Sequence, residues 1–347
     1  MRTTLQKARP VLRDRLAGWL HRQERRWTAA VAPRLVADAT GIRNTGWRTE
    51  SVSFTSTSVA VATVIRSGSP DRYVVKIPWT AAGADSLRRQ ATVLATLQQD
   101  PRLPNLRPVL PRCLAQATIE GRYSCVEEAL PGVSATALMV RRPGRTMLLR
   151  AATRLIGDLH ARTGEQTALD RPAVRGWVDA PLGRLERFAL TLSQPARVLD
   201  VIGRLREELI AVLVGRTVRV SWIHGDFWPG NLLAAPPGAR VTGVVDWDCA
   251  TPGQLPLYDL LHLHVLARRL TVGEELGDIV VHALRRGIDE TLNVPALEVG
   301  AWLDTIPQRA ALLLYWLRHT LLFIDSEGDH GNPRWLRANV ERVLANI

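Results

Sequence analysis

The sequence predicts an α+β fold in which a small β-rich lobe precedes a larger helical lobe. Residues 51–77 are rich in β-branched side chains and follow the period of strands. After residue 131, apolar residues recur at helical spacing, with one β-rich interruption between residues 218 and 245. A chain of 347 residues is also long enough for about two or three lobes that each bury a core.

The composition is that of a globular protein, because 46% of the residues are hydrophobic and the charged residues are spread along the chain. The formal net charge is +12, and nearly all of the positive charge is arginine, since Lys7 and Lys76 are the only lysines. Such a charge permits anionic partners. No nucleic-acid recognition module or basic-aromatic stripe accompanies it, so we expect no specific nucleic-acid partner.

The cysteines and the apolar runs restrict the location of the protein. The three cysteines show neither C-x-x-C nor Cys/His ligand spacing, which argues against a disulfide framework and a structural zinc site and favours the cytoplasm. The most apolar run, residues 310–324, contains Arg318 and His319 and is too short for a bilayer. We therefore expect no transmembrane segment.

Residues 1–45 form a basic N-terminal extension that we predict to be one or two helices. One face carries Leu12, Leu16, Trp19 and Leu20, with arginines around it. Packing on the body of the protein is the ordinary explanation for such an amphipathic face. Contact with a partner helix or an acidic membrane surface is the functional alternative.

Residues 46–130 form the predicted β-rich lobe, which Leu130-Pro-Gly132 closes. The predicted strands and the helix after the third of them cover residues 51–54, 59–65, 73–77, 84–98 (helix), 106–114 and 122–128. Residues 131–347 form the helical lobe. Its predicted elements are helices within residues 146–162, 181–214 and 256–347, and an embedded hairpin of strands 218–223 and 240–245.

Acidic residues follow both predicted hairpin strands, in the segments HGDFWPGN (224–231) and VVDWD (244–248). Phosphoryl transfer needs a carboxylate that orients the attacking hydroxyl and oxygen ligands for Mg²⁺. Asp226 suits the first task, and Asn231 with Asp246 suits the second. A capping role in loops would explain either segment alone, but the two together favour phosphoryl transfer.

This arrangement resembles the aminoglycoside phosphotransferase family and its choline kinase-like relatives, which have an H-G-D-x-x-x-x-N loop in a bilobal protein-kinase-like fold. The segment YVVKIP (73–78) resembles the third N-lobe strand with its phosphate-binding lysine, here Lys76. The segment CVEEALPG (125–132) resembles the hinge that contacts adenine through its backbone, which implicates Glu128 and Leu130. The resemblance extends over about residues 46–330 and leaves the N-terminal extension unexplained.

The resemblance implies a nucleotide-binding N-lobe over residues 46–130 and a C-lobe with the catalytic and metal-binding loops over residues 131–347. The implied activity is ATP- and Mg²⁺-dependent transfer of the γ-phosphoryl group to a hydroxyl of a small molecule. Asp226 would orient that hydroxyl, Asn231 and Asp246 would hold Mg²⁺, and Lys76 would bind nucleotide phosphates. Lys76 fits this role because a compact ammonium suits phosphates and is rare in this chain. The identity of the acceptor is not encoded in these motifs.

Three features depart from the family pattern. The turn at residues 54–58 lacks glycine, so the hydroxyls and amides of Ser56, Thr57 and Ser58 would face phosphate instead. Gln90 stands where the lysine-pairing glutamate of the family usually falls, with Asp85 as the next candidate counter-charge. Glu127 occupies a hinge position that is commonly apolar. Gln90 and the glycine-free turn favour the alternative of a catalytically weak nucleotide-binding scaffold that acts through its N-terminal helices.

Three further residues near the motifs receive structural roles. We expect His224 to brace the catalytic loop by hydrogen bonds, because Asp226 already supplies the base. Asp259 is expected to anchor a loop or begin a helix. For Asp248 a structural salt bridge is favoured over a second metal contact, since the strand before it ends near Asp246.

Overall fold

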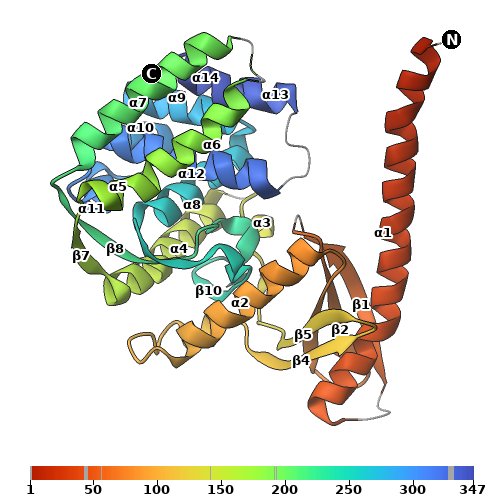
Figure 1. Ribbon diagram of the computed structural model, residues 1–347. Helices are drawn as coiled ribbons and strands as arrows, with labels where there is room; N and C mark the ends of the chain where they lie inside the picture. The colour runs from red at the N-terminus through yellow and green to blue at the C-terminus, as the bar shows by residue number, and fades with distance from the viewer. Residues whose placement is uncertain are drawn as a thin grey trace. The chain divides into compact units, whose positions relative to one another are not determined.

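The computed structural model divides the chain into two compact units, shown in Figure 1. Unit 1 contains residues 1–96 and 111–130, and unit 2 contains residues 97–110 and 131–347. The structure describes residues 2–42, 46–55, 57–140, 142–190, 192, 194–326 and 332–347, with the side chains of 2–20 and 325–326 left out. An antiparallel sheet dominates unit 1 and helices dominate unit 2, so the predicted α+β class is confirmed. No helix of the described part is long and apolar enough to cross a membrane.

Unit 1 is built on a five-stranded antiparallel sheet with the strand order β1-β2-β3-β5-β4. Its elements are α1 (Arg2–Thr40), β1 (Trp47–Phe54), β2 (Val59–Arg66), β3 (Arg72–Pro78), α2 (Ala81–Gln99, which ends in unit 2), β4 (Cys113–Ile119) and β5 (Arg122–Glu128). The strand predicted at residues 106–114 is displaced, because the observed strand in this part of the chain is β4, which begins at Cys113. Residues 107–109 form a 3-10 turn, η1 (Arg107–Val109), because Pro108 and Pro111 cannot donate to a ladder.

Helix α1 packs against this sheet through its C-terminal half. Ala32, Leu35 and Val36 are buried together with Val52 and Ile77 of the strands. The predicted packing of the N-terminal extension is therefore confirmed for residues 21–40, which belong to one helix. The predicted apolar face at residues 12–20 lies outside the described side chains.

Unit 2 contains two small three-stranded sheets within a helical body. The first has the order β11-β8-β7 and the second β10-β9-β6, with bounds β6 (Val133–Ser134), β7 (Glu165–Ala168), β8 (Thr217–Ile223), β9 (Leu232–Ala235), β10 (Arg240–Val244) and β11 (Thr251–Gln254). The hairpin predicted from residues 218–223 and 240–245 is wrong, because β10 pairs with β9 and β8 pairs with β7 and β11. The loop between the predicted strands contains β9, which the sequence pattern did not reveal.

The helices of unit 2 enclose one large core around Tyr315 and Trp316, both with no exposed surface. The longer helices are α4 (Arg142–Thr163), α6 (Asp179–Ala189), α7 (Pro195–Leu213), α8 (Leu257–Val272), α9 (Leu276–Arg286), α11 (Ala296–Leu303) and α12 (Gln308–Ser326). The shorter ones are α3 (Ala135–Leu138), α5 (Arg171–Trp177), α10 (Ile288–Leu292), α13 (Pro333–Leu336), η4 (Arg337–Glu341, a π-helix) and α14 (Arg342–Leu344), and 3-10 turns lie at 229–231 and 247–249.

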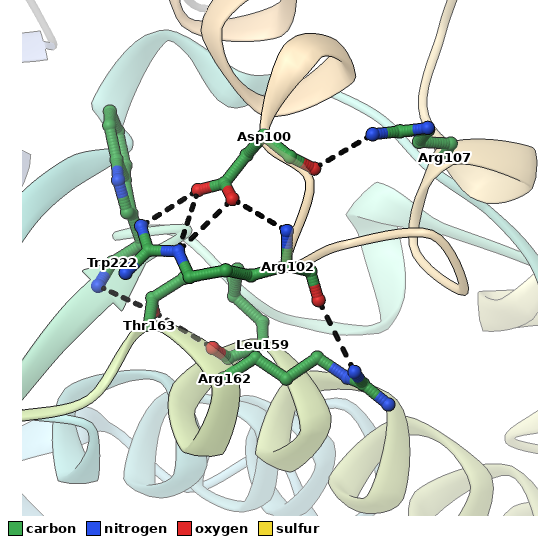
Figure 2. Close-up of polar contacts among 7 residues, drawn as sticks. All are labelled: Asp100, Arg102, Arg107, Leu159, Arg162, Thr163 and Trp222. Carbon is green, nitrogen blue, oxygen red and sulfur yellow. Dashed lines mark hydrogen bonds and ion pairs between the residues drawn. The ribbon is translucent and has the colours of Figure 1, made fainter.

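Residues 97–110 pack with unit 2, although the sequence analysis placed them in the N-lobe. Figure 2 shows the polar contacts that hold this segment. The side chain of Arg162 on α4 donates to the carbonyl of Arg102 (3.3 Å), and Asp100 binds the Arg102 guanidinium. Thr163, at the end of α4, accepts from the backbone N–H of Trp222 on β8 (3.1 Å). Helix α4 thus fixes the strand that leads into residues 224–231.

Candidate active site

The loop after β8 begins with a backbone turn that only glycine accommodates. Gly225 has φ +84°, and a Cβ built there would lie 2.4 Å from the carbonyl oxygen of Cys249. Positive φ and this close approach both exclude a side chain. The glycine between His224 and Asp226 therefore lets the loop pass directly beside the 247–249 turn.

Asp259, in the first turn of α8, anchors the same loop. Its carboxylate accepts the backbone N–H groups of His224 (2.8 Å) and Gly225 (2.8 Å) and a hydrogen bond from His160 (3.0 Å). Burial would raise the pKa of Asp259, but the hydrogen bond and charge of His160 and the interactions with His224 outweigh it, so its pKa lies below the ordinary value. The predicted loop-anchoring role of Asp259 is confirmed.

His224 braces the loop from the other side, as predicted. Its Nε2–H donates to the carbonyl of Val245 (3.0 Å), which requires that tautomer, and its Nδ1 accepts the backbone N–H of Asp226 (3.3 Å). Burial is the main cause that lowers the pKa of His224, so the ring is neutral. Trp247 packs against this ring and is fully buried, so its role is packing.

Both carboxylate oxygens of Asp226 are held by side chains. His262 Nε2 lies 2.9 Å from Oδ1, and Asn231 Nδ2 donates to Oδ2 (2.8 Å) and to the Asp226 carbonyl (2.9 Å). Burial would raise the pKa of Asp226, but the hydrogen bonds and charges of His262, His224 and Asn231 lower it below the ordinary value. The side chain is still 38% exposed. Asp226 thus has an ionised, oriented and accessible carboxylate.

His262 is a residue that the sequence analysis missed. It lies three residues after Asp259 on α8, so both point to the same helix face, and this spacing is the signal that could have revealed it. Its Nδ1 lies 3.1 Å from the hydroxyl of Tyr315, and its ring stacks on His319 at 3.9 Å. Burial is also the main reason why the pKa of His319 lies well below the usual range. This aromatic group fixes the His262 ring that holds Asp226.

Asn231 and Asp246 are brought near each other by the backbone. The N–H of Val245 donates to the carbonyl of Asn231 (2.9 Å), directly before Asp246 in the chain. Strand β10 ends at Val244, and Asp246 adopts a left-handed conformation (φ 67°) before the 247–249 turn that contains Asp248. Both described hydrogen bonds of the Asn231 side chain use Nδ2, which leaves its amide oxygen for a ligand. One carboxylate and one amide oxygen fit a hard divalent cation such as Mg²⁺.

In unit 1, Lys76 lies beside a carboxylate that the sequence analysis did not assign. The ammonium is 3.0 Å from both oxygens of Glu127 on β5. Gln90 Nε2 on α2 donates to Glu127 Oε1 (3.0 Å), so Gln90 belongs to this cluster through Glu127. Asp85, the other predicted counter-charge, instead pairs with Arg88 on the exposed face of α2. That alternative is therefore wrong.

The remaining predicted nucleotide-binding residues lie at the edges of unit 1. Ser56 lies outside the described residues. Thr57 hydrogen-bonds Thr55 (2.9 Å), and the carbonyl of Ser58 accepts the N–H of Trp79 (3.1 Å). Glu128 is exposed and its N–H donates to the carbonyl of Arg112 (3.2 Å), whereas Leu130 is half-buried at the end of the unit. Their nucleotide contacts remain predictions.

Comparisons with known proteins agree with these features. The sequence model of the phosphotransferase enzyme family matches residues 57–295. No curated protein sequence matches the chain. A mutant of aminoglycoside 2'-phosphotransferase-IIIa in complex with GDP has a similar fold (TM-score 0.54, 14% identity, 92% of this chain and 97% of that chain). So does APH(3'')-Id from Streptomyces rimosus with ADP and streptomycin (TM-score 0.50, 15% identity, 84% and 98%).

The family match covers more than half of the chain, including the loop of Asp226 and the segment of Asp246. The structural similarity extends the agreement to the fold as a whole. The chain therefore belongs to the phosphotransferase enzyme family, and it is a small-molecule phosphotransferase with the protein-kinase-like fold of the aminoglycoside phosphotransferases.

Proposed function

We propose that the protein transfers the γ-phosphoryl group of ATP to a hydroxyl of a small molecule, in a reaction that requires Mg²⁺. The observation that carries this proposal is the geometry of Asp226, whose carboxylate is ionised, held at both oxygens and still accessible. Such a carboxylate orients an acceptor hydroxyl and takes its proton during transfer.

The other residues receive roles from the chemistry of their atoms. The oxygens of Asn231 and Asp246 would hold Mg²⁺, which supplies neutralisation of the phosphate charge when bound. Lys76 binds phosphate oxygens, with its own charge held by Glu127. Glu128 and Leu130 supply the backbone of the adenine hinge, and the Thr57–Ser58 turn lies over phosphate. ATP as the donor places the reaction in the cytoplasm.

A nucleotide-consumption screen over hydroxylated acceptors tests the proposal. ATP and GTP are each incubated with the protein, Mg²⁺ and panels of sugars, nucleosides, amino alcohols and aminoglycosides, and products are weighed by mass spectrometry. The expected result is one acceptor class that gains a single phosphate, with no product from Asp226→Asn. Nucleotide binding without any acceptor-dependent product would contradict the proposal.

A catalytically weak scaffold is the second candidate, and its original support has weakened. It relied on Gln90, which implied a lysine without a carboxylate partner, and on the glycine-free turn at residues 54–58, and it would act through the N-terminal helices. The structure shows a carboxylate on Lys76 and packs residues 21–40 of α1 on the sheet. Contact of residues 1–20 with a partner or an acidic membrane stays a prediction.

A further inference from the structure

The counter-charge of Lys76 comes from a strand. Strands β3 and β5 are antiparallel neighbours in which Lys76 lies opposite Cys125, so Glu127, two residues further, faces the same side of the sheet. The Lys76 ammonium lies 3.0 Å from each oxygen of this carboxylate. Lys76 is 9% exposed and Glu127 is 3% exposed. A buried ammonium is costly without an opposite charge, so Glu127 stabilises the protonated lysine at this position.

Gln90 completes the cluster from helix α2. Its Nε2 donates to the Glu127 oxygen that also accepts from Lys76, and its side chain is equally buried. The polar groups of this cluster are one ammonium, one carboxylate, one amide and the thiol of Cys125, whose Sγ lies 4.0 Å from the same Glu127 oxygen. Glutamate and glutamine have nearly the same shape, so an exchange of residues 90 and 127 would conserve both the charge and the volume of the cluster.

We propose that Glu127 is the positioning residue that holds the Lys76 ammonium for nucleotide phosphates, replacing a carboxylate on the helix with one on strand β5. This inference rests on the proposed function, because it assumes that Lys76 binds a nucleotide. Gln90 then acts as the neutral partner that orients the carboxylate. In this arrangement a carboxylate at residue 90 is unfavourable while Glu127 is present, because two buried anions would share one ammonium.

The test exchanges the charge between the two positions. Binding of ADP with Mg²⁺ is measured by calorimetry for the wild type, Glu127→Gln, Gln90→Glu and the double variant Gln90→Glu/Glu127→Gln. Each single variant should weaken ADP binding about tenfold, because one lacks the anion and the other has two. The double variant should recover affinity to within about threefold of the wild type. Glu50→Gln, which removes a carboxylate from an exposed pair with Arg72 on the same sheet, is the matched control.

The outcomes separate this inference from the proposed function. A wild type that binds no ADP would remove the proposed function itself. If the wild type binds ADP and Glu127→Gln binds equally well or more tightly, Glu127 does not position Lys76 or competes with phosphate, and the inference is overturned. A double variant that is folded by circular dichroism but binds no better than Glu127→Gln also overturns it, because a merely structural pair gives no rescue of binding.

Discussion

Among the side chains that the structure describes, two acids are buried, Asp259 in unit 2 and Glu127 in unit 1, and they stabilise their surroundings in different ways. Asp259 accepts two backbone N–H groups of the loop that contains Asp226. The described hydrogen bonds of Glu127 to nitrogen come from the side chains of Lys76 and Gln90. A carboxylate that accepts backbone N–H groups has to lie beside that segment of the chain. A carboxylate that pairs with a long side chain can come from any helix or strand that this side chain reaches.

The two kinds of contact differ in the substitutions that they tolerate. An acid bound to backbone N–H groups has to stay where those groups point, because the path of the loop fixes their positions. An acid bound to an ammonium can move from helix to strand if an amide takes its former place. Variants at four residues, Asp259, Asp226, Asp246 and His262, test these roles in addition to the exchange of residues 90 and 127.

The largest effect is expected for Asp259→Ala. The change leaves two buried N–H groups and His160 without their acceptor, so the free energy of unfolding should fall by about 3–5 kcal/mol. Urea unfolding measures this loss. The control is Asp200→Asn, which removes an exposed pair with Arg204 on α7 and should change stability by less than about 1 kcal/mol. Equal stability of both variants would contradict the anchoring role.

Asp259 should also make the free energy of unfolding depend on pH. The pKa of Asp259 is lowered in the folded state, so its contribution to stability is fully present above the ordinary carboxyl pKa of 3.8 and is lost as the pH falls through the lower folded value. Asp259→Asn should therefore show a smaller loss of stability on acidification than the wild type. Unfolding curves between pH 6 and the acid limit of solubility check this expectation.

Asp226→Asn should have the next largest effect, on turnover alone. The amide cannot accept the hydroxyl proton, so turnover should fall on the order of 10²-fold or more, while nucleotide affinity stays nearly intact. Because the pKa of Asp226 is lowered, the wild type should keep its base ionised throughout the neutral range. Steady-state kinetics with the acceptor from the screen measures turnover. Near wild-type turnover in the variant would remove Asp226 from the mechanism.

Asp246→Ala should remove the Mg²⁺ dependence of nucleotide binding, because the amide of Asn231 is neutral and a hard cation needs an anionic ligand. Calorimetry measures ADP affinity with and without Mg²⁺. The factor by which Mg²⁺ increases this affinity should fall at least tenfold in the variant. Asp248→Ala is the companion variant and should keep the Mg²⁺ effect. The reverse result would make Asp248 the ligand.

The sequence predicted the loop that contains Asp226 and Asn231 and the strand that ends before Asp246, because these features depend on residues close in the chain. The roles of these three residues in catalysis and metal binding stay predictions. The Lys76 partner could not be predicted, because it depends on which strand lies beside β3, and β5 is 51 residues away at Glu127. For the same reason β9 was missed and a hairpin of β8 and β10 was wrongly predicted, since alternation reveals strands but not their pairing.

The smallest effect is expected at His262, which orients Asp226 and helps to lower its pKa but does not replace its carboxylate. His262→Gln keeps an N–H that can reach Asp226 Oδ1, and should retain turnover within about threefold of the wild type. His262→Leu removes that donor and leaves the Tyr315 hydroxyl unpaired, so turnover should fall about tenfold with an unchanged KM for the acceptor.

The kinetics of the two His262 variants show whether His262 orients Asp226 or only packs in the core. His282→Leu, a change at an exposed histidine side chain on α9, is the control. If both His262 variants lose turnover equally, the ring itself is needed for packing against His319 and the hydrogen bond is not decisive. If KM rises while turnover holds, His262 shapes the acceptor site and not the base. Turnover that is kept by glutamine and lost with leucine would show that the Asp226 carboxylate depends on a hydrogen-bond donor at residue 262, whose ring is stacked on His319 in the helical core.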